Sequence, residues 1–272
     1  MAALVQRARA PDKGGVTLSL SRSVWRPARA LWSLALDFVL PPRCPGCGLV
    51  VDGDHRFCVG CWQALDFLGP PCCASCALPL PHDLGEGARC GACHARPPAF
   101  DRAVAAVSCG DVARTVALRL KYGGRPGVAR TMAAQMARLV HAAPADAVVA
   151  AVPLHRWRLW SRGFNQALLI GRAMAERSGH ACLPDALIRT RATPVLRGLG
   201  RKARAKAVKG AFAVPAARRS AIHGRTVLLV DDVFTSGATA EACAAALKRA
   251  GAAEVWLVCW ARMLQAEDAG WR

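Results

Sequence analysis

The chain has 272 residues, of which 53% are hydrophobic, and a formal net charge of +19. This length suits one or two domains with a sizeable core, and the charge indicates an anionic partner: a nucleic acid, a phosphorylated metabolite or a membrane surface. Because we find no secretory signal and no uncharged apolar run long enough to span a bilayer, we expect neither a secreted nor a membrane-spanning protein.

The N-terminal part is predicted to have three sections. Residues 1–30 are Arg-rich, acid-poor and without apolar periodicity, which is typical of a flexible basic tail. Residues 31–40 are apolar except for Ser33 and Asp37, which stand four residues apart, and they predict a short amphipathic helix that ends at two prolines. With that helix, residues 31–97 form the first domain, and residues 98–272 form the second.

The first domain is dominated by cysteine. Eight of the thirteen cysteines of the chain form four C-x-x-C pairs. The pairs are Cys44 and Cys47, Cys58 and Cys61, Cys73 and Cys76, and Cys90 and Cys93. Each pair can present two thiolates to a tetrahedral ion, so two pairs complete one zinc site and the chain is expected to hold two structural zinc ions. The spacing leaves sequential and interleaved pairing open. A disulfide framework is the alternative to zinc. It would need an oxidising compartment, and the chain shows no export signal.

The second domain alternates predicted strands and helices. The expected elements are a strand at 103–109, helices at 112–121 and 128–142, a strand at 147–152, a helix at 164–178, a strand at 227–230, a helix at 238–250 and a strand at 254–260. This order predicts an α/β fold, with a mainly parallel sheet covered by helices on both faces. Ligands bind beyond the carboxyl ends of such strands, so the segments after Val152 and Val230 are expected to border one site.

The segment after Val230 carries the clearest ligand signal. Asp231 and Asp232 follow the apolar strand, and a loop of small and hydroxyl residues leads into the next helix. The loop residues expected to hold a phosphate are Thr235, Ser236, Gly237, Ala238 and Thr239. The two carboxylates would repel phosphate, so they are expected to face ribose hydroxyls or a magnesium ion. This string resembles the PRPP-binding motif of type I phosphoribosyltransferases.

A second signal consists of aromatic residues between cations. Trp157 and Trp160 alternate with Arg156 and Arg158, and Phe164 follows. Aromatic faces beside cations suit single-stranded DNA, although tryptophans three residues apart on a helix could instead pack into a core. Residues 189–225 add eleven Lys or Arg residues and no acid, and this run includes Arg201, Lys202 and Arg204.

Three further strings extend the resemblance. They are Leu120-Lys121-Tyr122, Arg162-Gly163-Phe164-Asn165-Gln166 and Gly210-Ala211-Phe212. With the phosphate motif and the cysteine pairs, the chain resembles the ComF family over roughly residues 31–263. These competence-associated proteins combine a double zinc ribbon with a type I phosphoribosyltransferase fold. The resemblance implies the binding of incoming single-stranded DNA during natural transformation. It also implies a place in the cytoplasm, at the inner face of the membrane, together with uptake-machinery proteins.

A working phosphoribosyltransferase with an unidentified acceptor is the alternative function. In that case Asp231 and Asp232 would be catalytic, and magnesium would bind together with PRPP. The turn at Pro153 and Leu154, with Lys121, Arg158 and Arg162, would bind the pyrophosphate. The chain departs from the family at two positions, because Leu196 stands where Gln is expected and Ala207 where Asn is common. These departures put the acceptor chemistry in doubt and leave the phosphate loop intact.

Overall fold

The structure, a computed structural model, describes residues 41–193 and 200–264. The predicted basic tail, the predicted helix at 31–40 and Leu196 lie outside the described residues. The described residues from 42 onward form one compact unit of the chain.

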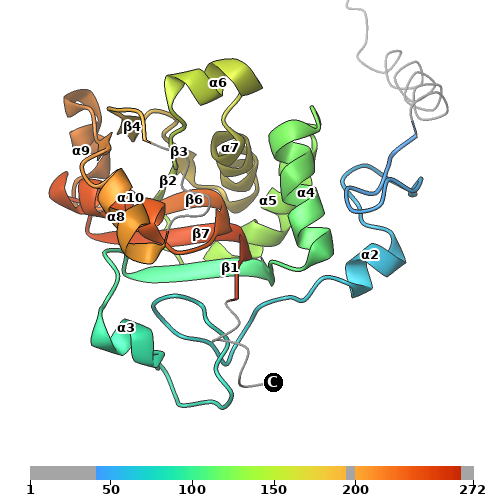
Figure 1. Cartoon of the computed structure of the whole chain (residues 1–272), viewed down its shortest axis with the longest axis horizontal. Helices are drawn as coiled ribbons and strands as arrows, with labels where there is room; N and C mark the ends of the chain where they lie inside the picture. The colour runs from blue at the N-terminus through green and yellow to red at the C-terminus, as the bar shows by residue number, and fades with distance from the viewer. Residues whose placement is uncertain (1–40, 194–199, 265–272) are drawn as a thin grey trace, which may run out of the picture. The chain divides into compact units, whose positions relative to one another are not determined.

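A five-stranded parallel sheet forms the centre of this unit (Figure 1). Its strands, in spatial order, are β1 (Arg102–Ser108), β7 (Glu254–Arg262), β6 (Thr226–Phe234), β2 (Val148–Ala151) and β3 (Ala181–Cys182). The central strands are almost continuously buried, since side chains on both of their faces pack against helices. The predicted α/β fold is therefore confirmed.

Helices cover both faces of the sheet (Figure 1). On one face α4 (Asp111–Tyr122), α5 (Val128–Met136) and α7 (Gln166–Ser178) pack against Leu228, Val230 and Trp260. On the other face α10 (Ala238–Arg249) and α8 (Arg201–Val208) pack against Leu229 and Leu257. Successive strand residues point to opposite faces, which is why neighbouring residues of β6 belong to different cores.

Several elements differ from the sequence prediction. Strand β6 continues through the acid pair to Phe234, four residues beyond the predicted end, because β7 pairs with it along that length. A helix that the sequence did not predict, α6 (Arg156–Arg162), follows β2. The basic stretch contains the helices α8 and α9 (Arg219–Ile222) and most of an antiparallel pair, β4 (Ile188–Arg189) and β5 (Phe212–Ala213). The predicted helix at 128–142 ends as the 3₁₀ helix η1 (Ala137–Val140), and a second 3₁₀ helix, η2, spans Ala216–Arg218.

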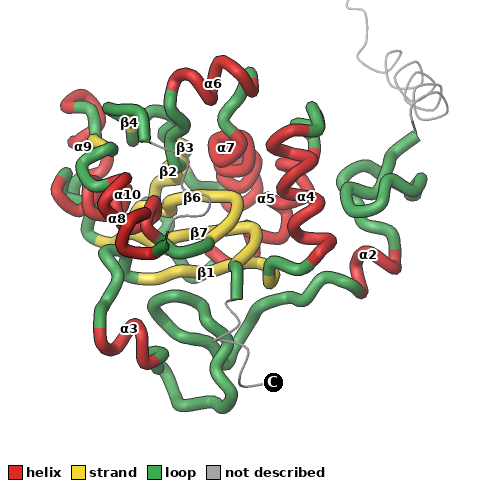
Figure 2. Tube along the Cα trace, viewed as in Figure 1, coloured by secondary structure: helices red, strands yellow, loops and turns green. Residues whose placement is uncertain are grey.

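Residues 42–95 are mostly loop, as Figure 2 shows, with two short helices, α2 (Val59–Gln63) and α3 (Gly91–Ala95). They join the sheet where Phe67 bridges to Val107 and where the backbone N–H of Leu68 donates to the carbonyl of Ala106 at 3.1 Å. Within the described part of the chain, no helix is long and apolar enough to cross a membrane.

Candidate functional site

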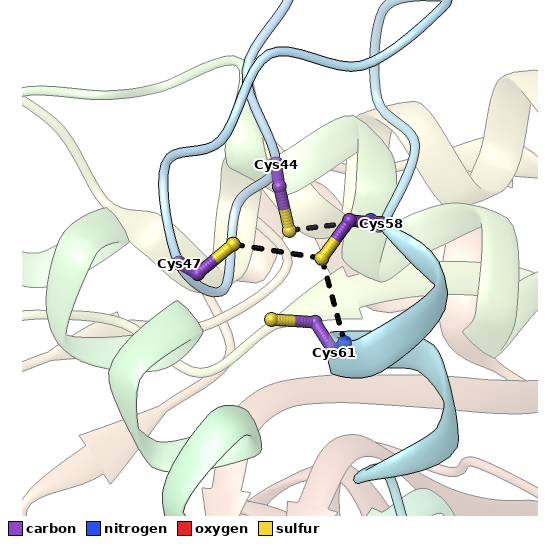
Figure 3. A group of neighbouring side chains, drawn as sticks. All are labelled: Cys44, Cys47, Cys58 and Cys61. Atoms are coloured by element: carbon purple, nitrogen blue, oxygen red, sulfur yellow. Dashed lines mark hydrogen bonds between the residues drawn. The ribbon is translucent and has the colours of Figure 1, made fainter.

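The cysteines form two groups of four. Cys44, Cys47, Cys58 and Cys61 make the first cluster, whose side chains converge in Figure 3, and Cys73, Cys76, Cys90 and Cys93 make the second. Within each cluster the sulfur atoms all lie within 4.8 Å of one another. The pairing is therefore sequential, which settles the alternative that spacing left open. The described clusters contain cysteines alone, without the neighbouring histidines.

The surroundings of the sulfur atoms lower the thiol pKa of one cysteine in each cluster. The backbone N–H of Cys58 donates to the Cys44 sulfur at 3.4 Å, and the N–H of Cys90 donates to the Cys73 sulfur at 3.3 Å. Burial opposes ionisation of Cys44, but backbone N–H donors outweigh it and lower the pKa of this thiol to about 6. A hydrogen bond from Cys76 is the main cause that lowers the pKa of Cys73 to about 4. Burial raises the pKa values of Cys61 and Cys93, and the hydrogen bond with Cys73 raises that of Cys76, so these thiols stay protonated until a cation binds. Four converging cysteine sulfurs fit tetrahedral Zn²⁺, whose charge would stabilise all four thiolates and which would cross-link each ribbon.

The loop that is expected to bind phosphate, residues 235–239, connects β6 to α10 and is called the phosphate loop below. Gly237 adopts a left-handed conformation with φ of 77°, and its backbone immediately precedes the first turn of α10. This turn faces a cavity of about 80 Å³, which the loop lines together with Asp231 and with Arg204 from α8. Thr235 is exposed, and Ser236 and Thr239 are half-buried on this cavity. Hydroxyls beside a helix N-terminus suit an anionic ligand.

The acid pair is divided between the two faces of the sheet. Asp231 is half-buried and lines the phosphate cavity beside Cys259. Asp232 is 4% exposed and points to the opposite face, where its Oδ2 lies 2.7 Å from the Nζ of Lys121 on α4. Burial opposes the charge of Lys121, but attraction to Asp232, the hydrogen bond to it and attraction to Asp231 outweigh burial and raise the pKa of Lys121. Only Asp231 is open to a ligand in the cavity.

The pH dependence of the melting temperature should reveal the raised pKa of Asp231. Burial, followed by repulsion from Asp232, raises the pKa of Asp231 from 3.8 to about 7, so the folded state holds a proton that the unfolded chain releases between these values. Stability should therefore fall as pH rises from about 4 to 7. The Asp231→Asn variant should melt at a higher temperature than the wild type above pH 7, with almost no difference near pH 4. Asp146→Asn, at an exposed site, is the control; a pH-independent gap for Asp231→Asn would contradict the assignment.

The loop after β2 is held by the Arg-Gly-Phe-Asn-Gln string. Asn165 caps α7, accepting from the N–H of Ala167 at 3.0 Å, and its Nδ2 donates to the carbonyl of Val152 at 3.1 Å. Gly163 ends α6 in the left-handed conformation with φ of 76°. The string thus fixes α6 and the turn at Pro153 and Leu154 against the end of β2.

Arg162 is held beside Lys121. Its guanidinium donates to Gln166 Oε1 at 3.2 Å and to the Tyr122 hydroxyl at 3.1 Å, and it lies 5.0 Å from the centroid of the Tyr122 ring. Tyr122 directly follows Lys121 on α4. The structure therefore brings these two predicted cations together at the carboxyl ends of β2 and β6.

The tryptophans of α6 are exposed. Trp157 is 62% exposed and Trp160 is 82% exposed, and their ring centroids lie 6.5 Å apart at nearly a right angle. Packing of these rings into a core is therefore excluded. Phe164, by contrast, is half-buried and packs against the core that α4, α5 and α7 share with the sheet.

A basic pocket lies beside these rings. It has a volume of about 450 Å³ and is lined by Arg156 and Trp157 together with Arg189 and Arg191 of the β4 segment. Burial, then repulsion from Arg158 and Arg191, lowers the pKa of Arg189, although Cys243 acts in the opposite direction. Arg189 and Arg191 belong to the predicted basic run at residues 189–225, but their position beside α6 was not predicted, because only the fold returns the β4 segment to that helix.

The three other cations that were predicted to bind DNA lie elsewhere. Lys202 is exposed on α8, and Arg204 lines the phosphate cavity instead of this pocket. The side chain of Arg201 lies outside the described part of the chain.

A parallel sheet with a phosphate loop, preceded by two four-cysteine ribbons, defines a phosphoribosyltransferase-fold protein with a double zinc ribbon. Models of the same two families match the chain: double zinc ribbon domain at residues 35–94 and phosphoribosyl transferase domain at residues 193–269. DNA utilization protein YhgH of Salmonella typhi is 32% identical over 178 residues, covering 62% of this chain and 77% of that protein. The chain belongs to the ComF family.

The chain is also similar to a competence protein and to a solved structure. Competence protein F of Haemophilus influenzae is 30% identical over 176 residues, covering 61% of this chain and 75% of that protein. Among solved structures, glutamine PRPP amidotransferase from B. subtilis matches with a TM-score of 0.35 and 22% identity, covering 52% of this chain and 30% of that chain.

Proposed function

We propose that this protein acts in DNA uptake by binding incoming single-stranded DNA on the α6 face, beside a ribose-phosphate pocket. The α6 face consists of Trp157, Trp160, Arg156, Arg189 and Arg191. The observation that carries the proposal is the exposure of both tryptophans next to a basic pocket. Two large aromatic rings that are left in water beside cations suit stacking on unpaired bases.

The charges around the α6 face support a polyanion. Arg156 lies 5.6 Å from the centroid of the Trp157 ring, and no carboxylate lines the basic pocket. Arg191 donates to the carbonyls of Ala207 and Lys209 at 3.1 and 2.7 Å, which ties the β4 segment to the end of α8. The cations are thus partly ordered before a ligand arrives, and this reduces the entropy cost of binding.

The names of the relatives indicate the biological process in which the proposed DNA binding would take place. One relative is a competence protein and another is a DNA utilization protein. We place this chain in the same process, in the cytoplasm, with proteins of the uptake machinery as partners. Its net charge of +19 would also favour the anionic inner face of the membrane.

The ribose-phosphate pocket would hold PRPP or a nucleotide-like ligand. The loop at 235–239 would bind the 5′-phosphate, and Asp231 would accept from ribose hydroxyls or from water on magnesium. Lys121 and Arg162 lie at the neighbouring strand end, where they would meet a pyrophosphate, with the turn at Pro153 and Leu154 and Arg158 alongside. Arg204 would add a cation over the same pocket.

Oligonucleotide binding tests the proposal. The purified protein is titrated into fluorescent oligothymidylate of roughly 20 nucleotides, and the anisotropy is followed from about 50 to 200 mM salt. With three or four phosphate contacts, the log–log slope should be roughly −2 to −3. A duplex of equal length should bind more weakly, since its bases cannot stack on the tryptophans. If the protein does not bind the oligonucleotide at low salt, the proposal is wrong.

Phosphoribosyl transfer is the second candidate function, and the position of Asp231 at the phosphate loop favours it. Incubation with PRPP, Mg²⁺ and a panel of bases should then release pyrophosphate. Asp231→Asn should reduce the release strongly, because the neutral amide binds ribose hydroxyls or magnesium less well. PRPP binding without pyrophosphate release from any acceptor would leave a ligand site and no transferase.

A further inference from the structure

Arg262, the last residue of β7, is a buried cation beside the second cysteine cluster. It is 7% exposed, and its Nη2 donates to the Cys76 sulfur at 3.6 Å. No carboxylate in the described part of the chain pairs with it, and its Nε has no hydrogen-bond partner there. A buried guanidinium needs a compensating anion. Four thiolates around Zn²⁺ carry a net negative charge, so the loaded cluster supplies that anion.

The other side of Arg262 contacts Phe234, which ends β6. The guanidinium carbon lies 4.9 Å from the centroid of the Phe234 ring, and β6 and β7 pair these two residues in register. Phe100 holds the same ring by an edge-to-face contact at 5.9 Å. The position of the ring therefore depends on Arg262, through a cation–π contact in a buried setting.

Phe234 in turn determines the shape of the phosphate loop. A Cβ atom on Gly237 would lie 2.9 Å from Cε2 of the Phe234 ring, so the left-handed turn at Gly237 fits directly against this ring. A displaced ring would leave that turn without support. Gly237 precedes the first turn of α10, whose N–H groups would meet the phosphate.

The loop also separates two cavities. Thr235, Ser236 and Gly237 line the phosphate cavity, and they also line a second cavity of about 110 Å³ whose other walls include Cys90 and Cys93. The second cluster therefore lies across a small gap from the residues that would bind phosphate. The first cluster instead meets α4, where Arg119 donates to the carbonyls of Cys44 and Pro45 at 3.3 and 2.8 Å.

We propose that Arg262 is a positioning residue that couples the second zinc site to the phosphate loop. The zinc-loaded cluster holds the guanidinium, the guanidinium holds the Phe234 ring, and the ring holds the turn at Gly237. This inference rests on the proposed ribose-phosphate pocket for its ligand. It predicts that zinc at the second cluster, and not at the first, sets the affinity for phosphate ligands.

The test compares Arg262→Met, Arg262→Lys and the control Arg119→Met. Zinc per chain and its release to a chelator are measured together with the affinity for PRPP and Mg²⁺ by calorimetry. Arg262→Met should release one zinc about 10-fold faster and bind PRPP about 5- to 10-fold more weakly. Arg262→Lys should recover part of both losses, because it keeps the charge. Arg119→Met should leave the PRPP affinity unchanged.

Hydrogen exchange gives a readout that needs no ligand. In Arg262→Met the amides of residues 234–241 should exchange faster, while those of α7 should not change. Phe234→Leu, which keeps an apolar side chain, should loosen the same amides with both zinc ions retained, and it serves if Arg262→Met fails to fold. Unchanged loop exchange in folded Arg262→Met or in Phe234→Leu would overturn the coupling. If the wild type binds no PRPP but the loop loosens as expected, the coupling stands and the proposed ligand is wrong.

Discussion

Replacing both Cys73 and Cys76 with serine is expected to unfold the second ribbon and to lower the melting temperature by about 10 °C or more. The change removes half of the ligands of one zinc ion, and structural zinc contributes roughly 10–16 kcal/mol of apparent binding free energy in small ribbons. The second cluster also packs in the same core as Phe100 and Phe234, so its loss opens part of the domain core. For a chain of this size, a shift of that amount corresponds to several kcal/mol.

The matched variant is Cys44→Ser with Cys47→Ser at the first cluster. It should also lose one zinc ion per chain, but its effect on the melting temperature should be smaller, because Cys47 is exposed and neither residue belongs to the cores of the sheet. The zinc content of both variants is measured by mass spectrometry, and their melting temperatures are measured by calorimetry. Equal losses of stability would show that the two ribbons support the sheet equally, against the packing described above.

Replacing Trp157 and Trp160 together with alanine should reduce the affinity for single-stranded DNA at least about 30-fold. Stacking of a base on an aromatic side chain contributes roughly 1–3 kcal/mol, and both rings are available to bases. Stability should hardly change, because the two side chains are 62% and 82% exposed and bury little surface in the fold. The dissociation constant is measured by anisotropy at low salt, together with the melting temperature.

Trp62 provides the control for this variant. It is 43% exposed on α2, in the first ribbon, and it contacts Phe57 and Phe67. Trp62→Ala should keep the oligonucleotide affinity within about 2-fold, which is the range of a substitution outside the interface. If Trp62→Ala and the double variant weakened binding equally, the α6 face would not be the binding site.

Much of the fold is visible in the sequence because its signals are local. Apolar runs predicted the central strands, and the cysteine spacing predicted two four-thiolate sites. The pairing of the cysteines depended on distances between knuckles, which spacing does not encode. The exposure of Trp157 and Trp160 could not be read from their spacing either, since a short helix on the surface and one in a core have the same period.

The contacts that shape the candidate site are long-range, and the sequence gives no signal for them. Lys121 meets Asp232 only because α4 covers one face of β6, and the alternation of the strand sends Asp231 to the other face. Arg262 lies 186 residues from Cys76, with which it shares a hydrogen bond. Arg189 and Arg191 reach α6 through the β4–β5 pairing, which spans the basic run. In each case the fold brings together residues that are far apart in the sequence and belong to no local motif that would predict the contact.

Photo-cross-linking tests the central claim most directly. Single-stranded DNA carrying 5-iododeoxyuridine is irradiated with the full chain at low salt, and the cross-linked peptides are identified by mass spectrometry. Because this base cross-links efficiently to aromatic rings on which it stacks, the adducts should lie in residues 156–162, on Trp157 or Trp160. Adducts confined to the cysteine ribbons at residues 42–95, or none above the level of an unrelated basic protein, would contradict DNA binding by the α6 face.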